Sequence, residues 1–159
     1  MATYREKESV RRVVEEFAGL EAVDEIVVVD GGSSDKTEEI AESFNAIVIH
    51  ADNPQIFHIN KQKAIDACKG IWILQLDADE VVTAELKSEI LEKVETGVDG
   101  YWIPRKNYFL GHWLKKGGVY PEYTLRLYRN GKGRLPCKTV HEQAEVNGEV
   151  GYLKNDLLH

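Results

Sequence analysis

Three carboxylates close together are the side chains of this sequence best placed to do chemistry. Asp77, Asp79 and Glu80 follow a nearly continuous apolar run at 71–76, which Gly70 bounds on its other side. The run is too short for a helix and is typical of a strand buried on both faces of a parallel sheet. Ligands of open α/β sheets bind beyond the carboxyl ends of the strands. We therefore expect these acids to lie at a binding site.

The spacing of the two aspartates allows three interpretations. In an extended segment Asp77 and Asp79 point to the same side, and a divalent cation that carries phosphates would relieve their repulsion. An acidic strand-to-helix turn, with carboxylates near a helix start, explains the same letters equally well. The segment also fits the D-x-D-x-[TV] loop of HAD-type phosphatases, with Asp77 as nucleophile. That class usually has the loop near the chain start and needs further acids and a lysine downstream.

A second polar cluster follows a β-branched run at 25–29 and opens a helical segment. Residues 30–35 read Asp-Gly-Gly-Ser-Ser-Asp. A carboxylate such as Asp30 can accept hydrogen bonds from a base or a ribose there, and glycines let the backbone approach a ligand. The helix start favours phosphate. The spaced glycines of the dinucleotide-binding fingerprint are absent, so the cluster alone indicates a nucleotide site only weakly.

Taken together, these pieces resemble family 2 glycosyltransferases of the GT-A fold. Residues 27–37 are similar to the first signature of that family, and residues 70–80 are similar to the second, the D-x-D metal site. The distance between the two signatures is that of the family. Residues 124–129, 140–142 and 151–159 resemble the subgroup that includes lipopolysaccharide-core β-1,4-glucosyltransferases.

The resemblance implies an inverting, metal-dependent transfer of a hexose from a nucleotide-sugar to a glycan or a lipid-linked acceptor, with a UDP-sugar as the expected donor. It implies that Asp30 binds the nucleobase or ribose. Asp77 and Asp79 would hold Mg²⁺ or Mn²⁺ against the diphosphate, where the metal neutralises charge on the departing group. Lys61 lies where the family has polar and basic residues near the donor, although a solvated helix face is the alternative. Tyr4 can stack on the base.

Inverting transfer also needs a carboxylate that takes the proton of the acceptor hydroxyl. Glu142 is the first candidate, because it follows a predicted strand at the place of the family's late acidic motif. Glu122 is the second candidate, and an ordinary surface glutamate is the alternative for both. His159 and His141 are candidates for a further metal ligand, against a structural role for each.

Aromatic and basic side chains are mixed in the segment 101–116. Aromatic faces suit sugar rings, and the basic-aromatic mixture suits a membrane surface or an anionic lipid-linked acceptor. Core aromatics beside a solvated loop are the alternative interpretation. The side chains concerned are Trp102, Tyr108, Phe109 and Trp113, with Arg105, Lys106, Lys115 and Lys116.

The elements that must position these residues alternate between strand and helix up to Gly97. This order predicts a parallel sheet with right-handed crossovers. Beyond Gly100 the pattern changes to strands and turn dipeptides, including a hairpin around Asn147-Gly148. We expect strands at 25–29, 46–49, 71–76, 101–105 and 124–129, and helices through 10–17, 40–44, 64–68 and 86–94, the last capped by Thr83.

The fold class that follows is α/β: the GT-A fold, with a central, mostly parallel sheet, flanking helices and a mixed or antiparallel C-terminal half. We expect one catalytic domain over residues 1–159. Its nucleotide-binding half covers about 1–98 and its acceptor half about 99–159. A chain of 159 residues is long enough for one domain with a real core.

The composition is that of a soluble globular protein, with 43% apolar and 30% charged residues. A net charge of -7 disfavours nucleic-acid binding. No apolar run is long enough to span a bilayer. We therefore expect a cytoplasmic protein, or one at the inner face of the membrane with a peripheral contact to it.

The start of the sequence departs from the family pattern. Family members normally begin with an apolar strand that leads into Thr-x-Asn-Glu, and residues 2–6 look like the tail of that motif, with Arg5 at the asparagine place. The strand itself is predicted to be absent, which would expose backbone and part of the donor pocket. The alternative function is therefore a non-catalytic nucleotide-binding domain that pairs with another chain, for example as a homodimer.

Overall fold

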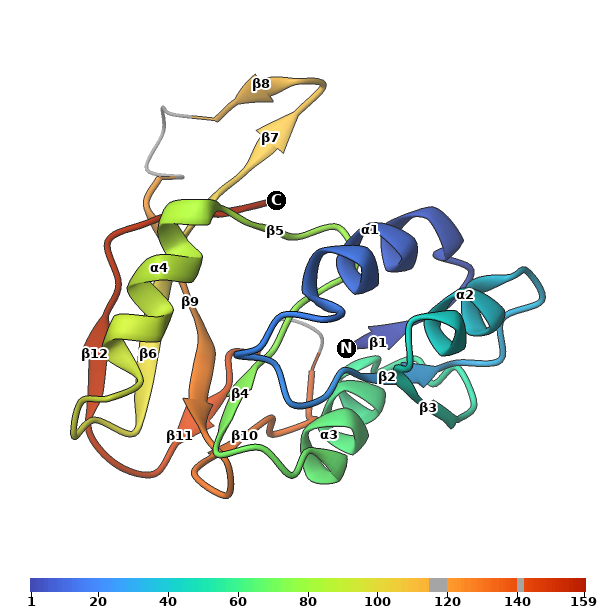
Figure 1. Ribbon diagram of the computed structural model, residues 1–159, viewed down its shortest axis with the longest axis horizontal. Coiled ribbons are helices and arrows are strands. Elements are labelled where there is room, and N and C mark those ends of the chain that lie inside the picture. Colours follow the sequence, from blue (N-terminus) through green and yellow to red (C-terminus); the bar gives the residue numbers. More distant parts are fainter. Residues whose placement is uncertain (115–119, 140–141) are drawn as a thin grey trace.

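A computed structural model describes residues 1–114, 120–139 and 142–159 of the chain. Its N-terminal part is a three-stranded parallel sheet in the order β1-β2-β3. Helices cover both faces of this sheet (Figure 1). The elements are β1 (Ala2–Thr3), α1 (Lys7–Phe17), β2 (Val27–Asp30), α2 (Thr37–Ser43), β3 (Ile47–His50) and α3 (His58–Ala67).

The β-branched run of β2 explains why this sheet has two covered faces. Val28 packs against α1 and α2 on one face, while Val27 and Val29 pack against Ala64 of α3 on the other. Successive side chains of a strand point to opposite faces, so a run of apolar residues needs a cover on each side. The predicted strand and its three neighbouring helices are confirmed.

A second sheet of six strands forms the rest of the fold. Five of its strands have the order β4-β9-β6-β13-β5, and β12 also pairs with β6. Thr83 caps α4 by accepting a hydrogen bond from the backbone N–H of Leu86 at 3.1 Å, as predicted. The elements are β4 (Trp72–Leu74), β5 (Val81–Val82), α4 (Ala84–Lys93), β6 (Gly100–Lys106), β9 (Glu122–Arg129), β12 (Val150–Tyr152) and β13 (Leu157–Leu158).

Two short antiparallel strand pairs lie outside these sheets. β7 (Tyr108–Phe109) pairs with β8 (His112–Trp113), and β10 (Gly133–Arg134) pairs with β11 (Glu145–Val146). The hairpin predicted around Asn147-Gly148 is wrong, because the chain after this turn joins β6 as the parallel strand β12. No helix in the described parts of the chain is long and apolar enough to cross a membrane.

The environment predicted for the central strand is also wrong. β4 pairs antiparallel with β9, and Ile71 just before it is 73% exposed. An apolar run indicates burial, but strand direction depends on the partner that tertiary packing supplies. Because β4 and β5 pair with the later strands β9 and β13, the two predicted halves share one sheet, and their division near residue 98 stays a prediction.

A strand does form at the start of the chain, so its predicted absence holds only in part. Ala2 and Thr3 pair in parallel with β2, and the Met1 carbonyl accepts a hydrogen bond from the Val29 N–H at 2.8 Å.

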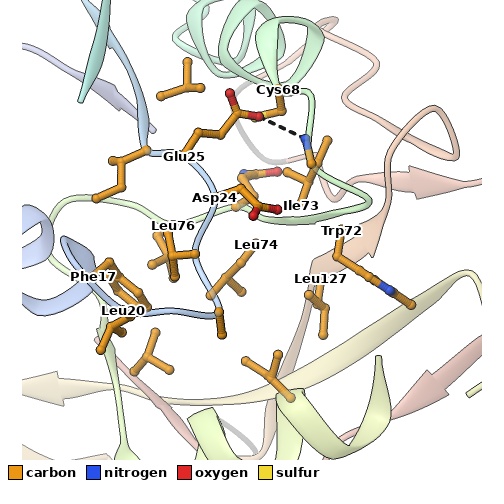
Figure 2. A pocket seen from close by; sticks show the side chains of 18 of the residues that line it. Phe17, Leu20, Asp24, Glu25, Cys68, Trp72, Ile73, Leu74, Leu76 and Leu127 are labelled. Carbon is orange, nitrogen blue, oxygen red and sulfur yellow. Dashed lines mark hydrogen bonds between the residues drawn. The ribbon is translucent and has the colours of Figure 1, made fainter. Parts of the chain in front are cut away.

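β1 and β4 are edge strands of their sheets. Between the two sheets lies an apolar cavity of about 670 Å³, whose walls include Phe17, Leu74 and Leu127 (Figure 2).

Leu86 tests whether α4 anchors the core of the second sheet. It is fully buried, among side chains of α1, β6, β9 and β13. We expect Leu86→Ala to lower the free energy of unfolding by about 3 kcal/mol, because it leaves a cavity in a packed core. Leu91→Ala on the same helix is the matched control, since Leu91 is exposed. Urea unfolding of both variants measures the difference, and equal losses would contradict this description of the core.

Candidate active site

Carboxylates and cations alternate at the carboxyl end of β4. Asp77 forms ion pairs with Lys61 of α3 and with Arg126 of β9, the second at 2.7 Å from Nη2 to Oδ2. The same Arg126 nitrogen lies 3.0 Å from Oε1 of Glu80, and Arg105 Nη1 of β6 lies 3.7 Å from that oxygen. Glu80 Oε2 accepts a hydrogen bond from the backbone N–H of Asp77 at 2.8 Å. Four elements therefore meet at one charged cluster.

The cluster shifts the pKa values of its two carboxylates in opposite directions. Burial acts to raise the pKa of Asp77, but Arg126 and Lys61 outweigh it and hold this pKa well below its ordinary value. Burial dominates at Glu80 and raises its pKa above the ordinary value. Lys61 is only 7% exposed, so it is not on a solvated helix face, and burial lowers its pKa. Asp77 is thus a firmly ionised carboxylate between two cations.

Asp79 faces solvent, in contrast to Asp77. Its side chain is 66% exposed, and its Oδ2 lies 3.3 Å from Nε2 of His159. His159 is placed there by β13, through backbone hydrogen bonds with Lys106 and Tyr108 at 3.0 and 2.7 Å. The fold therefore brings together two of the residues predicted to bind metal that lie 80 positions apart in the sequence.

A carboxylate oxygen and an imidazole nitrogen are a donor set that fits a divalent cation such as Mn²⁺, and the carboxylate fits Mg²⁺. Within the described residues no three histidine, cysteine or carboxylate side chains gather closely enough to hold a metal ion alone. A cation at Asp79 and His159 would therefore take further oxygens from a diphosphate or water, which is the usual coordination of Mg²⁺ with phosphates. Both oxygens of Asp77 already face cations of the protein.

Asp30 and Tyr4 lie at the carboxyl ends of β2 and β1. Asp30 is buried, and its carboxylate accepts hydrogen bonds from the backbone N–H groups of Gly32 and Ser33 at 3.0 and 2.8 Å and from the Ser33 hydroxyl. Asp30 thus shapes the loop that follows it. Tyr4 is exposed, and Arg5 lies 5.2 Å from its ring centroid. The contacts of both residues with a nucleoside stay predictions.

The two candidate bases lie in different surroundings. Glu142 accepts hydrogen bonds from the backbone N–H groups of Lys138 and Thr139, and its Oε2 lies 3.8 Å from Nδ1 of buried His58. Burial acts to raise the pKa of Glu142, but these amides and His58 outweigh it and bring this pKa below the ordinary value. The carboxylate is therefore ionised at neutral pH. His58 follows Phe57 at the start of α3, the helix that carries Lys61.

Glu122 is held by three donors on one oxygen. Its Oε2 accepts from Nε and Nη2 of Arg105 at 3.2 and 2.9 Å and from Nδ2 of Asn107 at 2.6 Å. Burial acts to raise its pKa, but Asn107 and Arg105 lower it below the ordinary value. Asn107 in turn contacts Nδ1 of His159 through Oδ1 at 2.9 Å, so Glu122 lies on the His159 side of the site.

Sequence reasoning missed Arg126, Arg105 and Asn107 as members of this site. Arg126 had a detectable signal, because it is a charged residue inside the otherwise apolar centre of a strand, where a buried charge needs a partner. Arg105 was predicted only as part of the basic-aromatic segment 101–116, and Asn107 had no signal beyond its place after a strand. His141, predicted as a further metal ligand, lies outside the described residues.

Comparison with known proteins identifies the family of this chain. Residues 1–144 match the family model for glycosyl transferase family 2. The chain belongs to this family. The resemblance predicted from the two sequence signatures is thereby confirmed, and the phosphatase alternative is excluded.

Relatives of this family 2 chain include a protein of lipopolysaccharide synthesis. The lipopolysaccharide core biosynthesis glycosyltransferase LpsC of Rhizobium meliloti (strain 1021) is 33% identical over 153 residues. The match covers 88% of this chain and 55% of LpsC, so the chain spans about half the length of that relative. This similarity agrees with the predicted lipopolysaccharide-type subgroup.

Solved structures share the fold at low sequence identity. S. aureus TarS 1-349 in complex with UDP matches with a TM-score of 0.73 and 18% identity, over 99% of this chain and 58% of that one. Glucosyl-3-phosphoglycerate synthase from Mycobacterium tuberculosis, in complex with Mn²⁺, UDP and glucosyl-3-phosphoglycerate, matches with a TM-score of 0.51 and 20% identity, over 69% of this chain and 42% of that one. These matches confirm the predicted GT-A fold.

Asp77→Asn tests the buried ion pairs. Because the pKa of Asp77 is depressed in the folded state, its contribution to stability is complete above the ordinary aspartate pKa of about 4 and is lost as the pH falls below it. At pH 7 the variant leaves Lys61 and Arg126 without their shared partner, and we expect a loss of about 3 kcal/mol in the free energy of unfolding. The loss should shrink toward pH 2.

Urea unfolding between pH 7 and pH 2 gives this measurement. Asp79→Asn is the matched control, since exposed Asp79 makes no such buried pair and its replacement should change stability by less than about 0.5 kcal/mol. A loss at Asp77 that stays constant with pH would contradict the proposed charge pairing.

Proposed function

We propose that this chain contains the catalytic site of an inverting, metal-dependent glycosyltransferase that moves a hexose from a nucleotide-sugar, with UDP as the expected nucleotide, to a glycan or lipid-linked acceptor. The observation that carries the proposal is the exposed pair of Asp79 and His159 in a family 2 chain, two residues after Asp77, which pairs with the cations Lys61 and Arg126. Carboxylate, imidazole and buried cations together suit a metal-bound diphosphate.

Donor binding follows from the order of these groups. Asp79 and His159 would hold Mg²⁺ or Mn²⁺, and the bound metal supplies neutralisation of the charge on the leaving diphosphate. Asp77 holds Lys61 and Arg126 through its ion pairs with them. The nucleoside would lie toward the ends of β1 and β2, with Tyr4 against the base and the loop shaped by Asp30 beside the ribose. TarS with UDP and the mycobacterial synthase with Mn²⁺ and UDP support this donor class.

Glu142 is the proposed base. Its ionised carboxylate would take the proton of the acceptor hydroxyl while that oxygen attacks the anomeric carbon and the bond to the nucleoside diphosphate breaks, which inverts the configuration. Glu122 is the second candidate. Both glutamates accept hydrogen bonds and have a lowered pKa, but only Glu142 lies in the segment 140–142 that resembles the family's late acidic motif. We favour Glu142 for this reason.

The alternative is a non-catalytic nucleotide-binding domain that pairs with another chain, and one observation favours it. The apolar cavity between the sheets lies where β1 and β4, the last strands of their sheets, leave edges without a partner strand in the described chain. Such edges are templates for pairing with another strand. In either case we propose a cytoplasmic protein. The glycosyltransferase would meet its acceptor at the inner face of the membrane.

Asp79→Ala and His159→Ala test the metal site. We expect each variant to lose about 100-fold in Mn²⁺-dependent donor hydrolysis or transfer, because the metal contributes several kcal/mol of charge stabilisation. Calorimetric titration with UDP, with and without Mn²⁺, should show the metal-dependent part of binding reduced to match. Glu92→Ala is the matched control, since Glu92 is an exposed acid on α4.

The same UDP titration, combined with the activity assay and light scattering, separates the two proposed functions. UDP binding without turnover, in a protein that light scattering shows to be a dimer, would support the non-catalytic alternative. Equal activity of the wild type and Asp79→Ala would remove the metal site from the proposal.

Glu142→Gln tests the base. We expect kcat to fall by about 100-fold or more, because no base then takes the proton of the acceptor hydroxyl. Binding of UDP with Mn²⁺ should stay unchanged. Glu122→Gln should cost less. A larger loss of kcat in Glu122→Gln, with the Glu142→Gln enzyme active, would reverse the assignment.

A further inference from the structure

The β7–β8 hairpin carries large apolar side chains into solvent. Phe109 is 65% exposed and Leu110 is 83% exposed, and Tyr108 beside them is exposed as well. Figure 1 shows that the hairpin projects away from both sheets, beyond the end of β6. Isolated exposed apolar residues are common on protein surfaces, but a projecting hairpin with consecutive ones at its tip is typical of an interaction site.

The turn of this hairpin makes the leucine harder to explain by folding. Tyr108 pairs with Trp113 and Phe109 pairs with His112, so Leu110 and Gly111 form a two-residue turn. Their φ angles are 47° and 76°, and turns with two such residues favour Asn-Gly. A leucine with positive φ is less stable there than an asparagine, because its Cβ crowds the backbone. Local stability therefore does not account for Leu110.

Basic and aromatic groups lie at the other end of the hairpin. Nζ of Lys106 lies 4.0 Å from the ring centroid of Trp113 and 5.8 Å from that of Tyr108. From base to tip the order is therefore cation, aromatic rings, apolar tip. This order matches the depth profile of a bilayer surface, with lysine at the phosphates, aromatic rings among the headgroups and apolar side chains at the acyl boundary.

A cleft joins the hairpin to the proposed site. It has a volume of about 630 Å³, and its lining includes the largely apolar side chains of Tyr108, Phe109 and Leu114 and the polar side chains of Glu122 and His159. A membrane-bound amphiphile could therefore enter from the hairpin with its polar group toward Glu122 and His159.

We propose that the β7–β8 hairpin docks this protein onto an anionic lipid bilayer, with Phe109 and Leu110 at the acyl boundary and Lys106 at the lipid phosphates. The net charge of the chain is -7, so general electrostatic attraction does not drive this contact. The contact goes beyond the proposed function and does not depend on its chemistry. If both hold, the bilayer presents its acceptor to the cleft.

Co-sedimentation of the full chain with vesicles of phosphatidylcholine, with or without phosphatidylglycerol, tests the proposal. The wild type should bind the anionic vesicles more tightly than the neutral ones. The double variant Phe109→Ser, Leu110→Asn should bind at least about tenfold more weakly, because two apolar side chains no longer leave water. Lys106→Gln should reduce the preference for anionic vesicles, which high salt should also reduce in the wild type.

The controls keep the result interpretable. Ile71→Ser removes an apolar side chain that is equally exposed but lies far from the hairpin in the chain, and it should leave vesicle binding unchanged. The double variant should unfold at the same urea concentration as the wild type and still bind UDP with Mn²⁺, because asparagine suits the turn. No binding by the wild type, or full binding by the double variant, would overturn the proposal. Neither outcome depends on glycosyl transfer.

Discussion

The ion pairs around Asp77 constrain how the two sheets and their helices come together. Lys61 belongs to α3, Arg126 to β9 and Glu80 to the turn after β4, and each is buried. A buried charge is tolerated only with a partner and good geometry, so misplacing any of these elements would leave a charge unpaired. The cluster thereby fixes the carboxyl end of β4, and with it the position of Asp79 at the surface.

A division of labour between neighbouring acids follows from this constraint. Asp77 and Glu80 are turned inward and hold cations of the protein, whereas Asp79 between them is turned outward toward His159. The pattern D-x-D-E therefore contains buried, cation-paired carboxylates and a solvent-exposed one side by side. The difference arises because the chain after β4 turns instead of continuing as an extended strand, so the two aspartates do not share a face.

Two groups of elements flank the candidate site. On one side lie the ends of β1 and β2, with Tyr4 and the loop shaped by Asp30. On the other, β6 continues into the β7–β8 hairpin, and Asn107 between them contacts both Glu122 and His159. Under the proposed function, the donor would lie toward Tyr4 and Asp30, and the proposed membrane-bound acceptor would approach from the hairpin.

The sequence by itself determined the family, the GT-A fold and the positions of most helices, because these depend on local periodicity and on two signatures of contiguous residues. It also identified Asp79 and His159 as candidates. Only the tertiary structure decided that these two meet, that Arg126 and Lys61 form ion pairs with Asp77, and that β4 runs antiparallel to β9. Strand direction and charge pairing are set by residues distant in the chain, and no local pattern encodes which of them will be neighbours.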